Sequence, residues 1–293
     1  MSNEFFRATI LAAACSLAGT ALAGGEAASA PMVRVPAGAF VMGSTAAERE
    51  YGYRLDEARG STAARRFQWF ANERRHGVAL SSYLLDRELV TNKAYQRFVK
   101  DTGHSVPHVD RQTWDSYGLV HPYESVARFL WIDGRYPTGR GRHPVVLVTQ
   151  QDAVAFCRWR GARDGRAFRL PTEAQWEKAA RGSDGRIFPW GNDFDPKRLN
   201  SADAGPYDTQ SVGRIPAGAS PYGILDMAGM VFEWTGDACA GQAGKAVVKG
   251  GSWDDYPGVT RAAARHCRVR ALKHILIGFR CAGELNGDET ASN

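Results

Sequence analysis

Glycine and proline interrupt the chain along its whole length. The sequence has 32 glycines and 13 prolines in 293 residues, and they occur in every part of it. Such residues limit regular structure to short helices and strands that are separated by turns. Short strand-like pieces, at 40–42 and 145–148, alternate with short amphipathic stretches. The pattern predicts a loop-rich α+β domain.

Two expected helices begin at capping boxes, in which a Ser or Thr side chain and the residue three positions later cap each other. The first box, at 149–152, predicts a helix over 153–160 that ends at Gly161. The second begins at Thr172 and predicts a helix that ends before Gly182.

A third helix is expected over 92–100, with Ala94, Phe98 and Val99 facing inward at helical spacing. Residues 48–76 are dense in charges of both signs and contain aromatic residues. We interpret this segment as a surface excursion rather than as core.

The N-terminal segment has the pattern of a secretory signal peptide over residues 1–23. A single arginine precedes an apolar run over 8–23, which ends in Ala-Leu-Ala. The run is too short for a permanent membrane span. Residues 24–31 are interpreted as a linker and residues 284–293 as a polar tail. The sequence predicts export to the periplasm or beyond and predicts no integral membrane segment.

Charge excludes some partners. The formal net charge is +6 at pH 7, and removal of residues 1–23 takes away one Glu and one Arg, which leaves it unchanged. This charge is mild and dispersed over the chain, so nucleic acid is not an expected partner. Residues 32–283 contain no repeat, no low-complexity segment and no second linker, so we expect one domain.

A series of motifs resembles one known family. They include VPAGAFVMGS (35–44), RLPTEAQWE (169–177), FPWG (188–191), YGILDMAG (222–229), EWT (233–235), GGSW (250–253) and GFR (278–280), with VTN (90–92) and HPV (143–145) between them. In this order they resemble the formylglycine-generating enzyme (sulfatase-modifying factor) family over nearly all of 32–283. The resemblance implies one loop-rich domain of C-type-lectin-like topology with bound calcium.

This sequence departs from the family at the positions of its copper ligands. The family's enzyme oxidises a sulfatase cysteine to formylglycine with copper(I) held by two thiolates, which are soft ligands suited to this ion. Here the first thiol position falls at or beside Asp255, and the second falls within 257–260. The serine of the site corresponds to Ser252, and its tryptophan is replaced by Phe232. We therefore expect a pocket without the copper centre.

Four cysteines remain after signal cleavage, and an exported compartment allows them to pair. The resemblance implies a bridge between Cys157 and Cys281, whereas the family's other bridge is lost at both ends. Cys239 and Cys267 have no counterpart in the family. They form a second bridge or are the remnant of a relocated thiol site, and we favour the bridge because exported thiol pairs are usually oxidised.

The resemblance implies two calcium sites built from backbone carbonyls and carboxylates, donors that suit this hard cation. The alternative interpretation of the first site is that Glu233 pairs with a buried arginine and does not bind calcium. The implied ligands are Asp226, Gly229, Val231 and Glu233 at the first site, and Asn200, Ser201, Asp203 and Gly205 at the second.

A non-heme iron site is not expected. His104, His108 and Asp110 superficially match the His-x-x-x-His-x-Glu motif of related sulfoxide synthases. Pro107 breaks the helix that would bring both imidazoles to one face. The resemblance also places that motif in a separate helical domain that this sequence lacks.

Ser252, Asp255 and His266 are the candidate catalytic residues. His266 with Asp254 or Asp255 is suited to acid–base work near neutral pH, although surface charge pairing explains the same pattern. Phe232, Trp253 and Arg265 are the candidate pocket residues, with core packing or a structural ion pair as the alternative. The aromatic insert over 117–136 either lines a peptide groove or covers the core.

Two classes of function stay open at this point. The first is an exported maturation or accessory factor, a monomer that binds a peptide or protein in the old substrate groove. The second is an oxidoreductase for oxidative tailoring, similar to the family member that matures the pyoverdine chromophore. Pure ligand binding, as in lectin-like relatives of the fold, is a third reading.

Overall fold

The computed structural model describes residues 31–285, which contain six α-helices and four short 3-10 helices. The α-helices are α1 (Ala46–Glu57), α2 (Ala63–Arg66), α3 (Asn92–Thr102), α4 (Arg111–Ser116), α5 (Gln150–Asp164) and α6 (Glu173–Arg181). The 3-10 helices are η1 (Tyr123–Ser125), η2 (Ala127–Phe129), η3 (Pro196–Arg198) and η4 (Pro216–Gly218).

Ten short strands form three sheets in the described part of the chain. One sheet has the order β1-β4-β10-β5, a second pairs β2 with β3, and the third has the order β8-β7-β6-β9. The strands are β1 (Met32–Val35), β2 (Gly38–Met42), β3 (His76–Leu80), β4 (Tyr83–Asp86), β5 (Phe168–Arg169), β6 (Phe232–Ala238), β7 (Lys245–Lys249), β8 (Arg265–Val269), β9 (Ile277–Gly278) and β10 (Ala282–Gly283).

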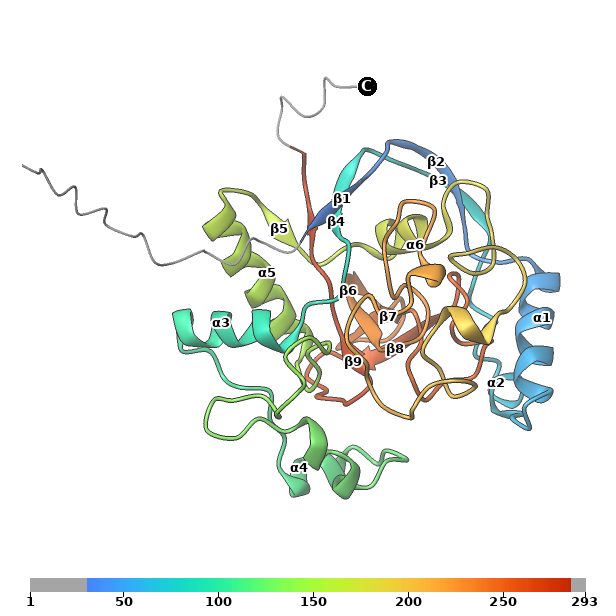
Figure 1. Cartoon of the computed structure of the whole chain (residues 1–293). Helices are drawn as coiled ribbons and strands as arrows, with labels where there is room; N and C mark the ends of the chain where they lie inside the picture. The colour runs from blue at the N-terminus through green and yellow to red at the C-terminus, as the bar shows by residue number, and fades with distance from the viewer. Residues whose placement is uncertain (1–30, 286–293) are drawn as a thin grey trace, which may run out of the picture.

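The sheet β8-β7-β6-β9 lies at the centre of the molecule. Figure 1 shows α1 and α2 on one side of it and α3 and α5 on the other. Strand β7 pairs antiparallel with both β6 and β8, and its central residues Ala246, Val247 and Val248 are fully buried. Short helices, short strands and long connections confirm the predicted loop-rich α+β class.

The capping boxes at Thr149 and Thr172 are both present, because each threonine side chain accepts from the backbone N–H three residues later. One predicted helix end is wrong. Gly161 lies inside α5, where an added Cβ would be 2.4 Å from the carbonyl oxygen of Arg166. Gly161 thus allows the returning chain to pass closely, and the left-handed Gly165 ends the helix.

The predicted strand over 145–148 is also wrong. These residues are buried, but the backbone is irregular and Leu147 has a positive φ of 60°. Their backbone groups bond to distant segments instead, from Val145 N to Val90 O and from Leu147 N to His274 O. The apolar run is therefore a core-crossing connection rather than part of a ladder.

Residues 48–76 are not merely a surface excursion, which corrects the prediction. Tyr53 and Phe70 are buried and stack with ring centroids 4.7 Å apart. Glu73 is 1% exposed and pairs with Arg261. Charge density misled the prediction because part of this charge is buried in an ion pair.

Both predicted disulfides are present. Cys157 in α5 is bonded to Cys281, which precedes β10. Cys239 is bonded to Cys267 in β8, so these two sulfurs are a bridge in this structure. Ala180 and Ala262, where the family's other bridge would lie, are both fully buried in one hydrophobic cluster.

Three predicted segments lie largely or wholly outside the described residues. They are the signal peptide (1–23), the linker (24–31) and the polar tail (284–293), of which only residues 31, 284 and 285 are described. Within 31–285, no helix has the length and apolar character that a membrane crossing requires.

Removal of either disulfide should destabilise the protein by an amount that rises with the logarithm of the number of residues in the loop that the disulfide closes. Cys157–Cys281 spans 124 residues and Cys239–Cys267 spans 28. The chain-entropy relation gives losses of about 5 and about 3.5 kcal/mol for the two double Cys→Ala variants. Urea unfolding measures both values, and a larger loss for the shorter loop would contradict the expectation.

Candidate functional site

The connection over 250–264, between β7 and β8, folds tightly on itself. Gly251 has a φ of 71°, and an added Cβ there would be 3.0 Å from Thr260 Cγ2. The Thr260 hydroxyl donates to the carbonyl of Pro257 at 3.0 Å. Glycine at 251 therefore lets the two ends of this connection, here called the site loop, approach each other.

No sulfur stands at the expected thiol positions in the site loop, which are Asp255 or its neighbours and the range 257–260. The Ser252 hydroxyl donates to Asp255 Oδ2 at 2.5 Å, and burial raises the pKa of Asp255 to about 6. Thr260, at the far end of the second position, is fully buried. Carboxylate and hydroxyl oxygens are poor ligands for soft Cu(I), so this donor set does not fit the copper centre of the family.

The site loop is fastened to α1 and to the chain that follows α2. Asp56 Oδ1 accepts from Gly258 N at 2.6 Å, and an added Cβ at Gly258 would be 2.6 Å from the Gly52 carbonyl oxygen. Arg261 donates to both carboxylate oxygens of Glu73, at 3.0 and 2.9 Å. These contacts fix the loop from outside, through the Gly258 backbone and the Arg261 side chain, and neither uses the side chain of Asp255.

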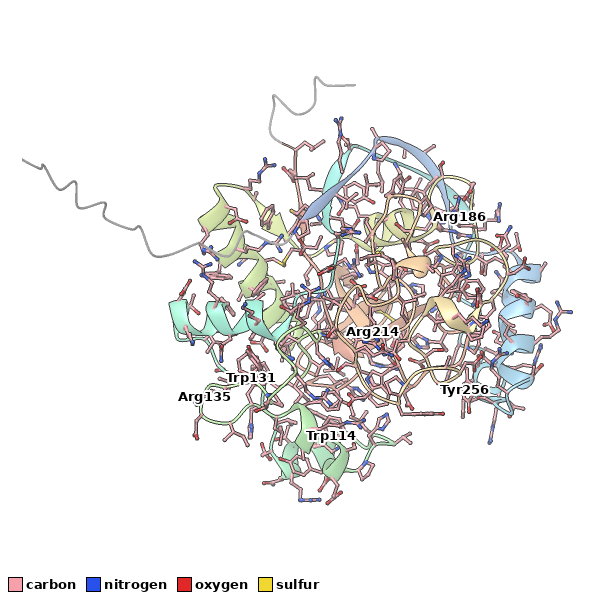
Figure 2. All side chains as sticks on the ribbon, in the orientation of Figure 1. Trp114, Trp131, Arg135, Arg186, Arg214 and Tyr256 are labelled. Atoms are coloured by element: carbon pink, nitrogen blue, oxygen red, sulfur yellow. A yellow bond between two sulfur atoms is a disulfide. The ribbon has the colours of Figure 1, made fainter. Side chains whose placement is uncertain are left out.

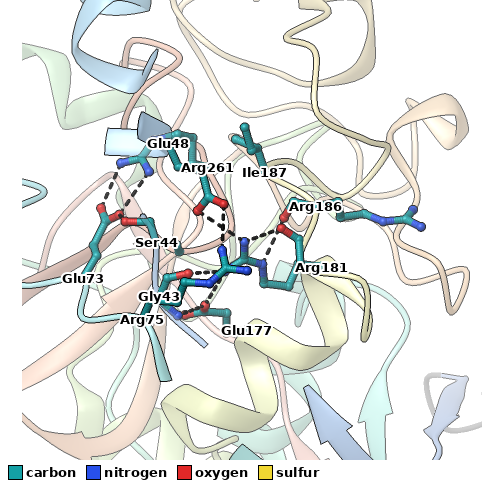
Figure 3. A network of polar contacts seen from close by, with 12 residues as sticks. Gly43, Ser44, Glu48, Glu73, Arg75, Glu177, Arg181, Arg186, Ile187 and Arg261 are labelled. Atoms are coloured by element: carbon teal, nitrogen blue, oxygen red, sulfur yellow. Dashed lines mark hydrogen bonds and ion pairs between the residues drawn. The ribbon is translucent and has the colours of Figure 1, made fainter. Parts of the chain in front are cut away.

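Figure 3 shows the buried charge network around this fastening. Beside the Arg261–Glu73 pair, Arg181 donates to Glu177 Oε1 at 3.0 Å, and Gly43 N donates to the same oxygen at 2.7 Å. Lys249, fully buried in β7, donates to Glu177 Oε2 at 2.9 Å. The network joins Gly43, which follows β2, to helix α6 and to the central sheet next to the site loop.

His266 lies in an aromatic setting and is neutral. Its ring makes edge contacts with Phe232 and Trp69, at centroid distances of 5.4 and 5.6 Å. Burial, and next the charge of Arg268, lower the pKa of His266 to about 3. Its buried Nε2 has no hydrogen-bond partner among the described residues.

The predicted acid–base pairing of His266 with Asp254 or Asp255 is not what the structure arranges. Asp254 pairs with His121, whose Nε2 lies 3.0 Å from Asp254 Oδ2. Asp255 is bonded to Ser252 instead. The three candidate catalytic residues belong to one region, but only Ser252 and Asp255 are directly joined.

The predicted pocket residues are buried in structural roles. Phe232 and Trp253 are 3% and 2% exposed, and Trp253 stacks on Phe129 at 6.4 Å. Arg265 donates to both oxygens of Glu173, at 2.6 and 3.1 Å. The Phe232 ring meets His266 at its edge.

Arg268, Trp69 and His121 were not singled out from the sequence. Arg268 lies two residues after His266 on β8, and its guanidinium is 5.8 Å from the Phe232 ring centroid. The alternation of side chains along a strand was the available signal for Arg268. Nothing local in the sequence brings Trp69 to this site, because it arrives from the segment after α2.

Several side chains predicted as calcium ligands have partners within the protein. Arg280 donates to both oxygens of Glu233, at 2.6 and 2.8 Å, which is the alternative considered above. Asp226, also of the first set, accepts from Gly213 N at 2.7 Å. Asp203 of the second set is paired with Arg59. Gly229 and Val231 offer only backbone carbonyls to the first set.

The second set is similarly engaged. Asn200 donates to the Asp208 carbonyl at 2.8 Å and accepts from Gln210 at 3.3 Å. Ser201 is fully buried, and its carbonyl accepts from Gly205 N at 2.9 Å. Calcium binding therefore stays a prediction from the family resemblance.

The histidines of the superficial iron motif are separated by their partners. His104 Nε2 lies 2.7 Å from Asp152, and Asp110 caps α4 by accepting from Thr113 N at 2.9 Å. His108 is exposed. Within residues 31–285, no group of three His, Cys, Asp or Glu side chains is placed to hold a metal ion.

The aromatic insert covers the core and also forms a separate hollow. Phe129 and Trp131 are buried, and Figure 2 shows Trp131 on the same side of the molecule as Trp114 of α4. A half-open cavity of about 560 Å³ lies within the insert and just after it. Its lining consists of Ala127, Leu130, Ile132, Asp133, Arg135, Tyr136, Pro137 and Thr138.

Comparison with known proteins identifies the class of this fold and site. The family described as sulfatase-modifying factor enzyme 1-like domain matches residues 21–285. The mouse inactive C-alpha-formylglycine-generating enzyme 2 is 30% identical over 303 residues, covering 88% of this chain and 87% of that protein. The mouse formylglycine-generating enzyme is 31% identical over 304 residues, covering 86% and 75%.

The fold has a solved counterpart. The structure of PvdO from Pseudomonas aeruginosa superposes with a TM-score of 0.67 at 24% identity, covering 87% of this chain and 94% of that one. This chain belongs to the sulfatase-modifying factor family of formylglycine-generating-enzyme-like proteins.

Substitution of Asp56 by asparagine should flatten the dependence of stability on pH. Burial raises the pKa of Asp56 from 3.8 to about 7. The folded state therefore favours the protonated carboxyl, whose stabilising contribution is complete below about pH 3.8 and is lost as the pH rises to about 7. Asparagine keeps an acceptor for Gly258 N without the charge.

Urea unfolding of the wild type and of Asp56→Asn at pH 4, 5.5 and 7 checks this expectation. The wild type should lose roughly 2–4 kcal/mol more than the variant between pH 4 and 7. Asp184→Asn is the control, since Asp184 is largely exposed and the Arg186 guanidinium lowers its pKa. Parallel pH profiles for the wild type and Asp56→Asn would contradict the role of Asp56.

Proposed function

We propose that this protein is an exported maturation or accessory factor that binds a peptide or protein segment beside the site loop, without copper-dependent formylglycine synthesis. The observation that carries the proposal is the oxidation state of the cysteines. All four cysteines among residues 31–285 are in disulfides. The site loop carries no sulfur where a copper centre needs two thiolates.

The family also contains a relative whose name states that it is inactive as a formylglycine-generating enzyme, and it matches this chain over most of its length. The scaffold of the site is nevertheless kept, because Asp56, Glu73 and Arg261 hold the loop in place. A site loop that keeps its position but lacks the metal-binding sulfurs supports binding rather than oxidation.

Two disulfides support the export part of the proposal. Disulfides persist in oxidising compartments and are rare in reducing ones. Both bridges in the described chain join segments of the core, from α5 to β10 and from the end of β6 to β8. We therefore propose the periplasm or the cell exterior as the working compartment.

The exposed rim of the site suits an extended ligand. Trp69 is 36% exposed and Phe67 is 62% exposed, and Trp69 contacts His266 at the pocket. Exposed aromatic side chains beside a buried polar site are typical of peptide and protein contact surfaces. The ligand would lie across this rim and reach the site loop.

A second candidate is oxidative tailoring by a non-standard site. It is favoured by the grouping of Asp255, His266 and His274, whose pKa values are all displaced by burial, since such groups gather at active sites. Elemental analysis of the purified protein separates the two functions. Stoichiometric copper or iron would favour oxidation and would contradict the binding proposal.

Absence of formylglycine synthesis is tested directly. The purified chain, supplied with copper(I), oxygen and a cysteine-containing sulfatase peptide, should leave the peptide's thiol unchanged in mass spectrometry. The formylglycine-generating enzyme of Streptomyces coelicolor, a 31% identical relative, is the positive control. Appearance of the aldehyde with this chain would overturn the proposal.

Binding at the rim is tested with a library of synthetic, N-acetylated decapeptides passed over the immobilised protein. Trp69→Ala should lower peptide retention about tenfold, because tryptophans at contact surfaces commonly contribute 2 kcal/mol or more. Ile132→Ala is the matched control, since Ile132 is 72% exposed but lines the separate cavity of the insert. No retention by the wild type, or equal loss in both variants, would contradict binding at this rim.

A further inference from the structure

Strand β8 presents two polar side chains to the same aromatic ring. His266 and Arg268 both contact the ring of Phe232, at 5.4 and 5.8 Å. Cys267 between them belongs to the opposite face by strand alternation, where it is bonded to Cys239. The disulfide therefore lies on the opposite face of the strand from His266 and Arg268 and restrains the backbone of that strand.

Arg268 differs from the deeply buried arginines of the described chain. Each of those pairs with a carboxylate: Arg160 with Asp86, Arg181 with Glu177, Arg261 with Glu73 and Arg280 with Glu233, at 2.6 to 3.0 Å. Arg268 has no carboxylate within 4.0 Å among residues 31–285. Its Nη1 donates only to the carbonyl of Cys267, at 3.2 Å.

Arg268 is half-buried, and no carboxylate of the described residues lies at ion-pair distance to neutralise its charge. Burial lowers the pKa of its guanidinium, and the charge of Asp255 opposes that shift from beyond ion-pair distance. The Asp255 carboxylate accepts a hydrogen bond from Ser252. The carboxylate of the preceding residue, Asp254, pairs with His121.

The two neighbouring imidazoles cannot supply a countercharge. Burial is the largest cause of the lowered pKa of His266 and of His274, about 3 for each, and Arg268 is the next. Both rings are therefore neutral at physiological pH. His274 accepts from Leu276 N, whereas His266 Nε2 has no partner among the described residues.

An exposed aromatic side chain lies next to His266. Trp69 meets the edge of His266, and exposed Phe67 lies two residues before it. A ligand group that satisfies both features has an anionic end for Arg268 and a carbon stem for the aromatic rim. In a peptide, a glutamate or aspartate side chain or the C-terminal carboxylate has this composition.

We propose that Arg268 is the anchor for a carboxylate of the bound peptide, with His266 Nε2 beside it and Trp69 against the adjoining carbon chain. This inference rests on the proposed function and deepens it, because it specifies which peptides the site selects. A guanidinium offers two parallel N–H donors that match a carboxylate, and such charge-assisted pairs are stronger than neutral hydrogen bonds.

The test uses a decapeptide library in matched pairs. In one arm the pairs differ only by Glu against Gln at a single position, and in the other by a free against an amidated C terminus. Retention on the immobilised wild type, quantified by mass spectrometry, should favour the carboxylate member by about tenfold in one arm. The arm that responds distinguishes a side-chain from a C-terminal carboxylate.

Variants then assign the preference to Arg268. Arg268→Gln should abolish the tenfold ratio, and Arg268→Lys should keep part of it, because lysine retains the charge but loses the planar fork. Arg214→Gln is the control for net charge, since Arg214 is exposed, and Figure 2 shows where it lies. Thermal unfolding confirms that each variant is folded, and the ratio within one variant does not depend on its stability.

The outcomes separate the two proposals. Retention that depends on Trp69 but shows no carboxylate preference, or a preference unchanged in Arg268→Gln, overturns the anchor role alone. No retention of any peptide overturns the proposed function and the anchor with it. A ratio that falls equally in Arg214→Gln would show a general charge effect and would also overturn the assignment.

Discussion

Buried pairing of arginine with carboxylate holds the irregular backbone of this domain together. Arg261 and Glu73 are separated by 188 residues in the chain, and Arg280 and Glu233 by 47. Their side chains are at most 1% exposed. Removing one partner of such a pair leaves an uncompensated buried charge, which typically costs 3–5 kcal/mol. In a fold with short strands, these pairs join segments that few ladder hydrogen bonds connect.

The same pairing explains how a site can lose its metal ligands and keep its shape. The site loop is positioned by Arg261 at one end and by the bond from Gly258 to Asp56 near its middle. The Gly258 contact uses only the backbone N–H, and Arg261 lies outside the positions where thiols would lie. Ser252 and Asp255 then bond to each other within the loop. Oxygen donors could thus replace sulfur there without removing what holds the backbone.

The sequence predicts local features well because their causes are local. A capping box needs only two residues three apart, and both boxes formed as expected at Thr149 and Thr172. Motif order gave the family and the fold. The end of α5 was misplaced because Gly161 serves a close approach by Arg166, which a helix-ending rule does not consider.

The site was harder to predict because its partners are distant in the sequence. The charged segment over 48–76 looked like surface, yet Glu73 meets an arginine 188 residues later. His266 was recognised, but its neighbours Trp69 and Phe232 come from two other parts of the chain. Asp254 and Asp255 were assigned to His266, whereas each has a nearer partner in His121 or Ser252.

Arg268 is informative because the rest of the described chain pairs its deeply buried guanidiniums. An unpaired, partly desolvated cation destabilises the folded state, so its place beside neutral imidazoles is not explained by stability. The disulfide at Cys267 restrains the backbone of β8 on the opposite face, next to Arg268. A restrained strand has less backbone freedom to lose when an anion binds to Arg268, and such preorganisation favours binding.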